Sequence, residues 1–231
     1  MTSPARYRIA FGKAEAMRFT GHLDLHRTWE RTIRRAGLPL AYSEGFNPQP
    51  RLNIGAALPL GCLSRGDLID VWLERDVDPG DVERALRRAT PPGIAIEGVA
   101  RMAAAEPVLQ TLIESAVYEV ASDEFPARPE MVRRIDELLA SARLPRSRRG
   151  KSYDLRPLIE TLAFDEGQSS LRMCLSAHEA AVGRPEEVLD ALGLDPTHAL
   201  AVRTELVLHD PGPKAAHSSD QGQTETASEP M

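Results

Sequence analysis

Residues 19–37, FTGHLDLHRTWERTIRRAG, carry the pattern from which the fold can be read. Apolar side chains recur here every three or four residues, which places them on one face of a helix. These side chains are Leu25, Trp29, Ile33 and Ala36. Gly37 and Pro39 follow this stripe and predict where the helix ends. Because the preceding segment 7–14, YRIAFGKA, is typical of a strand, the chain begins with a strand followed by an amphipathic helix.

The rest of the chain repeats one order of elements twice. In the first half, strands are predicted at 51–61, 67–74 and 93–102, and a second helix at 78–91. In the second half, strands are predicted at 112–122, 152–165, 169–177 and 199–210, and helices at 128–142 and 184–193. Strand–helix–strand–strand–helix–strand is the order of the ferredoxin-like unit. We therefore predict an α+β protein of two tandem ferredoxin-like domains, residues 1–104 and 105–210, followed by a disordered polar tail at 211–231.

Composition limits the class of protein. The chain has 231 residues, of which 42% are hydrophobic and 27% charged, as expected for a soluble globular protein. No apolar run approaches the ~20 residues that a membrane-spanning helix needs, and the N-terminus lacks the apolar core of a signal peptide. Cys62 and Cys174 are far apart, without a C-x-x-C partner, and predict neither a disulfide framework nor a zinc site. A cytoplasmic protein without a membrane or metal partner fits these features.

Charge is distributed unevenly. The whole chain has a formal net charge of −6, yet residues 1–60 hold nine basic and four acidic side chains, a net +5. Residues 143–156, RLPRSRRGKSYDLR, hold six basic side chains and one acid. Two basic segments on an acidic chain indicate a polyanion as partner. The alternative is that both segments are ordinary solvated faces.

The basic segments supply the predicted binding residues. Four arginines lie on one face of the first helix, and a fifth follows in the next loop: Arg27, Arg31, Arg34, Arg35 and Arg51. The second segment is predicted to be a basic loop that contributes Arg146, Arg148, Arg149, Lys151 and Arg156. Arginine suits phosphate because its planar fork donates two parallel hydrogen bonds. The competing interpretation, an i,i+4 pair such as Glu30–Arg34, accounts for one or two arginines but not for the set.

His22 and His26 raise two further hypotheses. Their i,i+4 spacing matches half of a zinc site, but Leu23 stands where a metalloprotease needs glutamate and no third ligand is evident. The second hypothesis is a metal-independent endoribonuclease, since tandem ferredoxin-like domains with a basic helix resemble Cas6-type RNA endonucleases. There His22, His26 and Tyr42 would be the catalytic candidates. The glycine-rich loop of those enzymes is absent from the end of the last predicted strand.

The segment 42–53, YSEGFNPQPRLN, is turn-rich and is predicted to be a stiff loop because two prolines restrict the residues before them. We expect Tyr42 and Phe46 to pack this loop. A rigid loop that carries polar side chains is a typical construction for a binding site.

Two motifs, MRFTGHLDLHRTWERTIRRAGLPLAYSEGFNPQPRLNIGAALPLG and RGKSYDLRPLI, closely resemble the DUF2344 family of radical SAM-linked proteins. The matching positions include Phe19, Gly21, His22, Asp24, Gly45, Phe46 and Asp154. The resemblance implies a radical SAM enzyme on a separate chain as partner. This chain has no C-x-x-x-C-x-x-C triad for an iron–sulfur cluster, so no cofactor is predicted for it. Asp24 and Asp154 are expected to orient neighbouring basic side chains.

The sequence therefore predicts a non-catalytic accessory protein of a radical SAM enzyme that binds or presents a substrate, with RNA as the favoured ligand. A ribonuclease and a protein-interaction module without nucleic acid remain the alternatives.

Overall fold

A computed structural model of the chain describes residues 3–148, 150–178 and 181–209. In this part of the chain the protein is a mixed α+β structure with four α-helices and a nine-stranded, mostly antiparallel sheet. The predicted tail, 211–231, lies outside the described residues. No helix in the described part is both long and apolar enough to cross a membrane.

The elements follow the predicted order in both halves. The first half contains β1 (Ala5–Lys13), α1 (His22–Arg35), β2 (Leu52–Ile54), β3 (Leu63–Leu73), α2 (Pro79–Ala89) and β4 (Ile94–Met102). The second half contains β5 (Ile113–Ala121), α3 (Arg128–Ala140), β8 (Ile159–Asp165), β9 (Ser170–His178), α4 (Pro185–Ala191) and β11 (Leu200–Leu208). The second half also contains three short strands: β6 (Pro145–Arg148), β7 (Lys151–Asp154) and β10 (Ala181–Val182).

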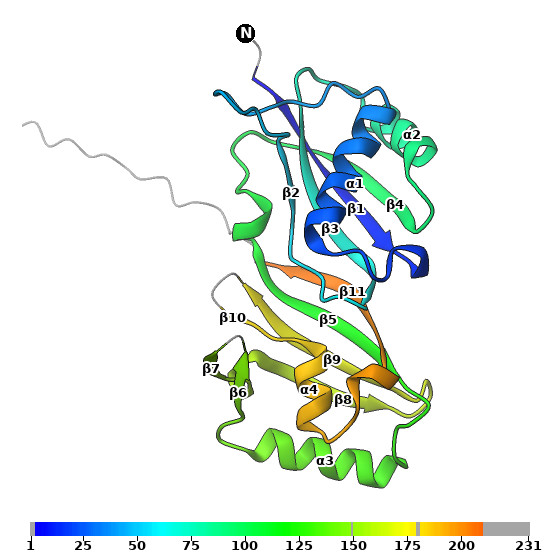
Figure 1. Ribbon diagram of the computed structural model, residues 1–231, viewed down its shortest axis with the longest axis vertical. Coiled ribbons are helices and arrows are strands. Elements are labelled where there is room, and N and C mark those ends of the chain that lie inside the picture. The colour runs from blue at the N-terminus through cyan, green and yellow to red at the C-terminus, as the bar shows by residue number, and fades with distance from the viewer. Residues whose placement is uncertain (1–2, 149, 179–180, 210–231) are drawn as a thin grey trace, which may run out of the picture.

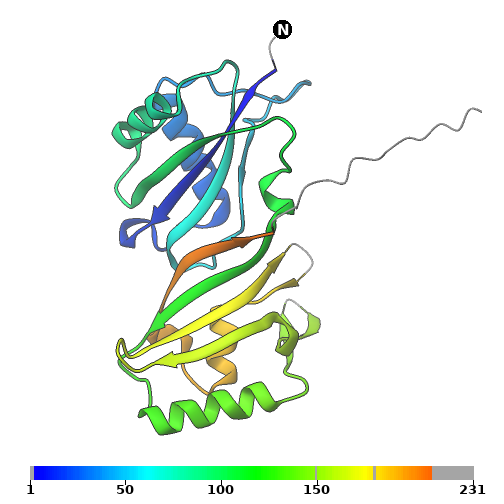
Figure 2. The ribbon, with the colours of Figure 1, turned by 180° about the vertical axis from the view of Figure 1, so that it is seen from behind.

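The two halves form one continuous sheet. The strand order is β10-β9-β5-β11-β3-β1-β4, with β2 paired to β3 and β8 paired to β9. Helices α1 and α4 lie in front of the sheet in one view and behind it in the opposite view, so one face of the sheet carries both (Figures 1 and 2). Each half has its own hydrophobic core. In the first half, the ring of Trp29 on α1 meets Phe11 of β1 edge to face at 4.9 Å, as the apolar stripe predicts.

Two predictions of strand extent were wrong. The predicted strand 51–61 is a strand only over β2, because the chain then turns and runs as a loop over residues 55–62. The predicted strand 152–165 is broken after β7 by a short 3-10 helix (Arg156–Leu158), and Pro157 within this turn has no backbone N–H to offer a neighbouring strand.

The predicted basic loop in the second half is a β-hairpin. Strands β6 and β7 pair antiparallel from Pro145↔Asp154 to Arg148↔Lys151. Gly150 in the connecting turn has φ 76°, a conformation that glycine adopts without steric cost. The polar residues of this hairpin show no alternation with apolar ones, which is why the sequence pattern indicated a loop.

The halves are joined by a short parallel pairing between β11 and β3. Val202 pairs with Leu63 and Arg203 pairs with Ser64. Gly66 is required beside this junction, because a Cβ there would overlap the carbonyl oxygen of Thr204.

A buried ion pair stabilises the same junction. The Nε of Arg203 donates to Oδ1 of Asp67 at 2.6 Å, and each side chain is 1% exposed. Arg203 also donates to the carbonyl oxygens of Ala56 and Ala57, at 2.9 and 3.3 Å. Burial disfavours the charge on Arg203, but Asp67 and then Tyr118 outweigh this effect and raise the pKa of the guanidinium. One side chain of the second half thus fixes two segments of the first.

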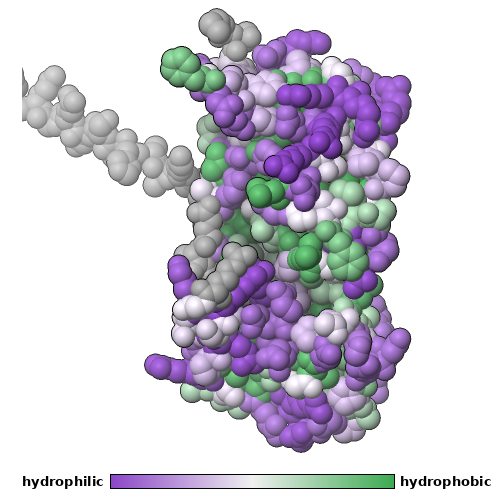
Figure 3. Space-filling model, in the orientation of Figure 1, coloured by the Kyte–Doolittle hydropathy of each residue, from purple (hydrophilic) through white to green (hydrophobic). Residues whose placement is uncertain are grey.

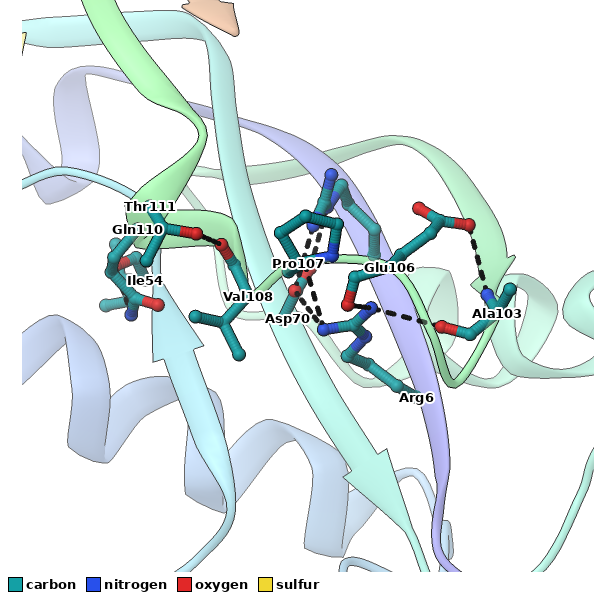
Figure 4. A network of polar contacts seen from close by, with 10 residues as sticks. Arg6, Ile54, Asp70, Ala103, Glu106, Pro107, Val108, Gln110 and Thr111 are labelled. Carbon is teal, nitrogen blue, oxygen red and sulfur yellow. Dashed lines mark hydrogen bonds and ion pairs between the residues drawn. The ribbon is translucent and has the colours of Figure 1, made fainter. Parts of the chain in front are cut away.

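The linker between the halves is fastened by Arg6 on β1. Its guanidinium donates to the carbonyl oxygens of Ala103, Glu106 and Pro107 at 3.2, 2.8 and 3.1 Å (Figure 4). The same side chain lies 3.9 Å from the buried carboxylate of Asp70. These contacts account for the burial of Arg6, an arginine that is only 8% exposed.

Replacing Arg203 should test the junction. Arg203→Met leaves the Asp67 carboxylate buried without its partner, so we expect a loss of about 3–5 kcal/mol in the free energy of unfolding, measured by urea denaturation. The double variant Asp67→Leu/Arg203→Met removes both charges and should recover much of this loss.

Arg65→Ala is the matched control, because Arg65 pairs with Glu119 at 3.0 Å but is 68% exposed. Its cost should stay below about 1 kcal/mol. An equal loss in the single Arg203 variant and the double variant would contradict the role given to the buried pair.

Candidate functional site

Two adjacent cavities lie where the halves meet, on the face that carries α1 and α4. The larger, about 460 Å³, we call the Phe19 cavity, and the smaller, about 360 Å³, the His22 cavity. The Phe19 cavity is lined among others by Arg18, Phe19, Leu60, Arg148, Arg184 and Glu186. The His22 cavity is lined among others by His22, Ala56, Tyr118, Val182, Arg184 and Arg203. Since Arg184 lines both, the cavities are neighbours, and we refer to the two together as the groove between the halves.

The loop of residues 55–62 forms one wall of this groove. Arg203 holds its first part through the carbonyl oxygens of Ala56 and Ala57. Lys13, only 1% exposed, holds its end by donating from Nζ to the carbonyl oxygen of Cys62 at 3.4 Å. The same Nζ donates to the carbonyl oxygen of Arg18 at 3.0 Å. Burial lowers the pKa of Lys13, with Asp67 acting in the opposite direction. The wall is therefore built from backbone fixed by two buried cations.

Positive charge predominates in the Phe19 cavity. Arg18 is committed to the loop, because its Nε donates to the carbonyl oxygen of Gly61 at 2.9 Å. Arg184 lies 3.6 Å from the carboxylate of Glu186. The side chain of Arg148 forms no hydrogen bond or ion pair within the described part of the chain. Burial raises the pKa of Glu186, the one acid that we place in the cavity, and the nearby charge of Arg148 opposes this effect.

Exposed apolar side chains lie beside these arginines. Phe19 and Leu60 are 72% and 68% exposed. The guanidinium of Arg18 lies over the Phe19 ring, 5.2 Å from its centroid. Hydrophobic surface gathers across the middle of this face, between α1 and α4 (Figure 3). The groove thus offers an aromatic and apolar wall next to cations with unused donors.

His22 begins α1, and Gly21 precedes it as the N-terminal cap residue. Desolvation lowers the pKa of His22, and the nearby charges of His26 and Arg203 lower it further. The ring is therefore expected to be neutral near pH 7. Among the described residues no three His, Cys, Asp or Glu side chains come together as a metal site would require.

The predicted arginine face of α1 is largely engaged in contacts within the protein. Asp24 was expected to orient a neighbouring basic side chain, and the exposed Arg27 lies 3.3 Å from it. Arg35 donates to the carbonyl oxygen of Ala89. Arg31 is exposed, and its side chain has no hydrogen bond or ion pair among the described residues.

Arg34 is held by two partners. It pairs with Glu30 at 2.9 Å and donates to the hydroxyl oxygen of Tyr42 at 2.7 Å. The structure does not bring Tyr42 to the histidines, because Arg34 lies twelve residues after His22, about 18 Å along a helix axis. His26 lies one turn from His22 on the same helix.

The loop of residues 42–53 after α1 is held by a hydrogen bond across it, but one of its two aromatic side chains does not pack within it. Ser43 N donates to the carbonyl oxygen of Gln49 at 2.8 Å, and Gly45 at φ 123° forms the turn. Phe46 was expected to pack this loop, but it is fully exposed. Arg51 lies over the ring of Trp72, 5.2 Å from its centroid.

The second basic segment is partly structural. Arg146 faces Glu187 and Asp190 of α4 at 3.8 and 3.5 Å, and this contact holds the β6–β7 hairpin against the helix. Arg156 donates to the carbonyl oxygens of Leu139 and Ile159, at 3.1 and 3.2 Å. Lys151 is exposed, and Arg149 lies outside the described residues.

Asp154 supports the base of the hairpin. Its Oδ1 accepts from the backbone N–H groups of Leu144 and Arg156, at 2.8 and 3.0 Å. The hydrogen bond from Leu144 is the largest of the effects that hold the pKa of Asp154 below its usual range. Asp154 was expected to orient a basic side chain. Its two hydrogen bonds are instead accepted from backbone N–H groups, one of which belongs to Arg156.

The model of one protein family, described as an uncharacterized protein conserved in bacteria (DUF2344), matches residues 6–185. The chain belongs to the DUF2344 family. No curated protein matches the chain.

The groove joins parts of this DUF2344 protein that are distant in sequence. Phe19 and His22 come from the first motif, and Arg148 immediately precedes the second. Sequence reasoning missed Arg18, Arg184, Glu186 and Arg203. Of these four, only Arg203 could have been found from the sequence pattern, because it is a charged residue at a buried position of an otherwise apolar strand.

An NMR pH titration should place the pKa of His22 below its ordinary value of about 6.5. Because the unfolded chain binds this proton more tightly, the contribution of His22 to stability is complete above pH ~6.5 and is lost as pH falls below it. A midpoint for His22 above 6.5 would contradict the desolvated position at the groove.

Proposed function

We propose that this DUF2344 protein is a non-catalytic accessory subunit that binds RNA in the groove between its halves for a radical SAM enzyme on a separate chain. The observation that carries the proposal is the convergence of Arg148 and Arg184 with Phe19 and His22 in one groove. The partner enzyme is inferred from the family resemblance of the two sequence motifs.

The proposed architecture is two tandem ferredoxin-like units. In the first half the strands lie in the order β4-β1-β3-β2, and in the second half in the corresponding order β11-β5-β9-β8. Within each half neighbouring strands are antiparallel. Both orders agree with a pair of split βαβ units.

Arginine with unused donors favours a phosphate ligand. The guanidinium groups of Arg148 and Arg184 line the groove and keep N–H donors that have no hydrogen-bond partner among the described residues. Each can present two parallel N–H donors to a phosphate. Most of the arginines on α1 are engaged within the protein, so the groove offers a better-preorganised anion site than that helix face. Neutralising phosphates releases counterions, so binding should weaken steeply with salt.

The cysteines support an accessory role. Burial raises the pKa of the Cys62 thiol to about 11, and burial together with Glu160 does the same for Cys174. Neither is disposed to form the free thiolate that a nucleophile requires. Because the chain has two cysteines, it also lacks the three that hold the cluster of a radical SAM enzyme, and the radical chemistry would belong to the partner enzyme.

Fluorescence anisotropy with a labelled single-stranded RNA should show a steep dependence of affinity on salt. In Arg148→Ala/Arg184→Ala, loss of two phosphate contacts should reduce the slope of log K against log salt by about 1.4. Arg88→Ala, an exposed arginine on α2, is the control and should keep the parental slope.

Absence of RNA binding even at low salt would overturn the RNA proposal. If the same purified chain then bound a radical SAM enzyme, a protein-interaction module would replace it.

A further inference from the structure

We propose that the Phe19 cavity is a nucleotide site that receives one base against Phe19 and Leu60 and its phosphate on Arg148 and Arg184. The inference rests on the proposed function, because it names what part of an RNA enters the groove. The same chemistry is offered by a free nucleoside monophosphate and by an unstacked nucleotide of a single strand.

The cavity has the size and the lining for such a ligand. Its volume of about 460 Å³ lies in the range of small-molecule pockets, ~300–1,000 Å³. Apolar residues of both halves form its floor and walls, among them Leu60, Leu189 and Ala201. Cations lie beside them, so one molecule with a planar apolar part and an anionic part can satisfy both.

The base end is defined by Phe19. Phe19 is 72% exposed, although the residue before it, Arg18, ends a 3-10 helix (Glu15–Met17) and accepts a hydrogen bond from Lys13 through its carbonyl oxygen. The guanidinium of Arg18 lies over the ring, 5.2 Å from its centroid. A base can stack on the ring and on the flat guanidinium, as bases do on aromatic and arginine planes of RNA-binding proteins.

The phosphate end is defined by two arginines whose backbones are fixed. Arg148 ends β6, and the contacts of Arg146 with Glu187 and Asp190 hold that strand against α4. Arg184 immediately precedes α4. The side chains of both remain partly exposed. Fixed backbones with unused guanidinium donors present a preorganised anion site.

Glu186 is an acidic side chain beside the two arginines that we assign to the phosphate, and replacing it separates a binding role from a structural one. Its carboxylate lies 3.6 Å from Arg184 and feels the charge of Arg148, so it competes with a bound phosphate for both arginines. Glu186→Gln should therefore strengthen binding of an anionic ligand, whereas damage to the fold would weaken it.

Isothermal titration calorimetry of the full chain with AMP and UMP tests the site. We expect binding of both nucleotides, about tenfold weaker binding of adenosine, and at least tenfold weaker binding of AMP by Phe19→Ala. Arg148→Gln should weaken AMP but not adenosine. Glu186→Gln should bind AMP several-fold more tightly.

Phe46→Ala is the matched control, because Phe46 is also an exposed phenylalanine but does not line the cavity. It should bind AMP as the parent does. Failure of AMP and UMP to bind at millimolar concentration, or an equal loss in both phenylalanine variants, would overturn the nucleotide site.

Competition with single-stranded RNA separates the two sources of the ligand. Displacement of AMP by RNA would support an unstacked nucleotide of the strand as the natural occupant. Binding of AMP without any binding of RNA would support the site for a free nucleotide and overturn the proposed function. Binding of RNA without AMP would overturn the site and leave the proposed function in place.

Discussion

The arrangement of the two halves depends on one buried ion pair, between Arg203 of β11 and Asp67 of β3. The pairing of those strands involves two residue pairs, too few to fix an orientation through backbone hydrogen bonds alone. The ion pair adds a second constraint at the same point, and the donation from Arg203 to Ala56 and Ala57 extends it to the loop of residues 55–62. A charge with almost no exposed surface tolerates little displacement of its partners, because lost hydrogen bonds would not be replaced by water.

The groove is a consequence of this junction. Its lining includes the loop that Arg203 and Lys13 hold in place, the segment around Arg184, and Arg148 of the β6–β7 hairpin. Residues of both halves are needed to line the groove. The polar surface within the groove is therefore arranged by the contact between halves, and a ligand held there would in turn stabilise that contact.

The local patterns of the sequence predicted much of the fold. The apolar stripe of α1 is buried at Leu25, Trp29 and Ile33, and both halves follow the predicted element order. The candidate site was harder to predict from the sequence, because Asp67 and Arg203 lie 136 positions apart and meet only through sheet pairing. Charged residues at inward positions of apolar strands were the one signal of this junction. Charge counting favoured the face of α1, where Arg34 and Arg35 serve internal contacts instead.

Photo-crosslinking of a 4-thiouridine-containing single-stranded RNA, followed by mass spectrometric mapping, tests the central claim most directly. The account predicts crosslinks within residues 18–22 and 184–186, the two sides of the groove, and their loss when excess unlabelled RNA competes. Crosslinks confined to α2 and β4, far from the junction of the halves, would contradict it.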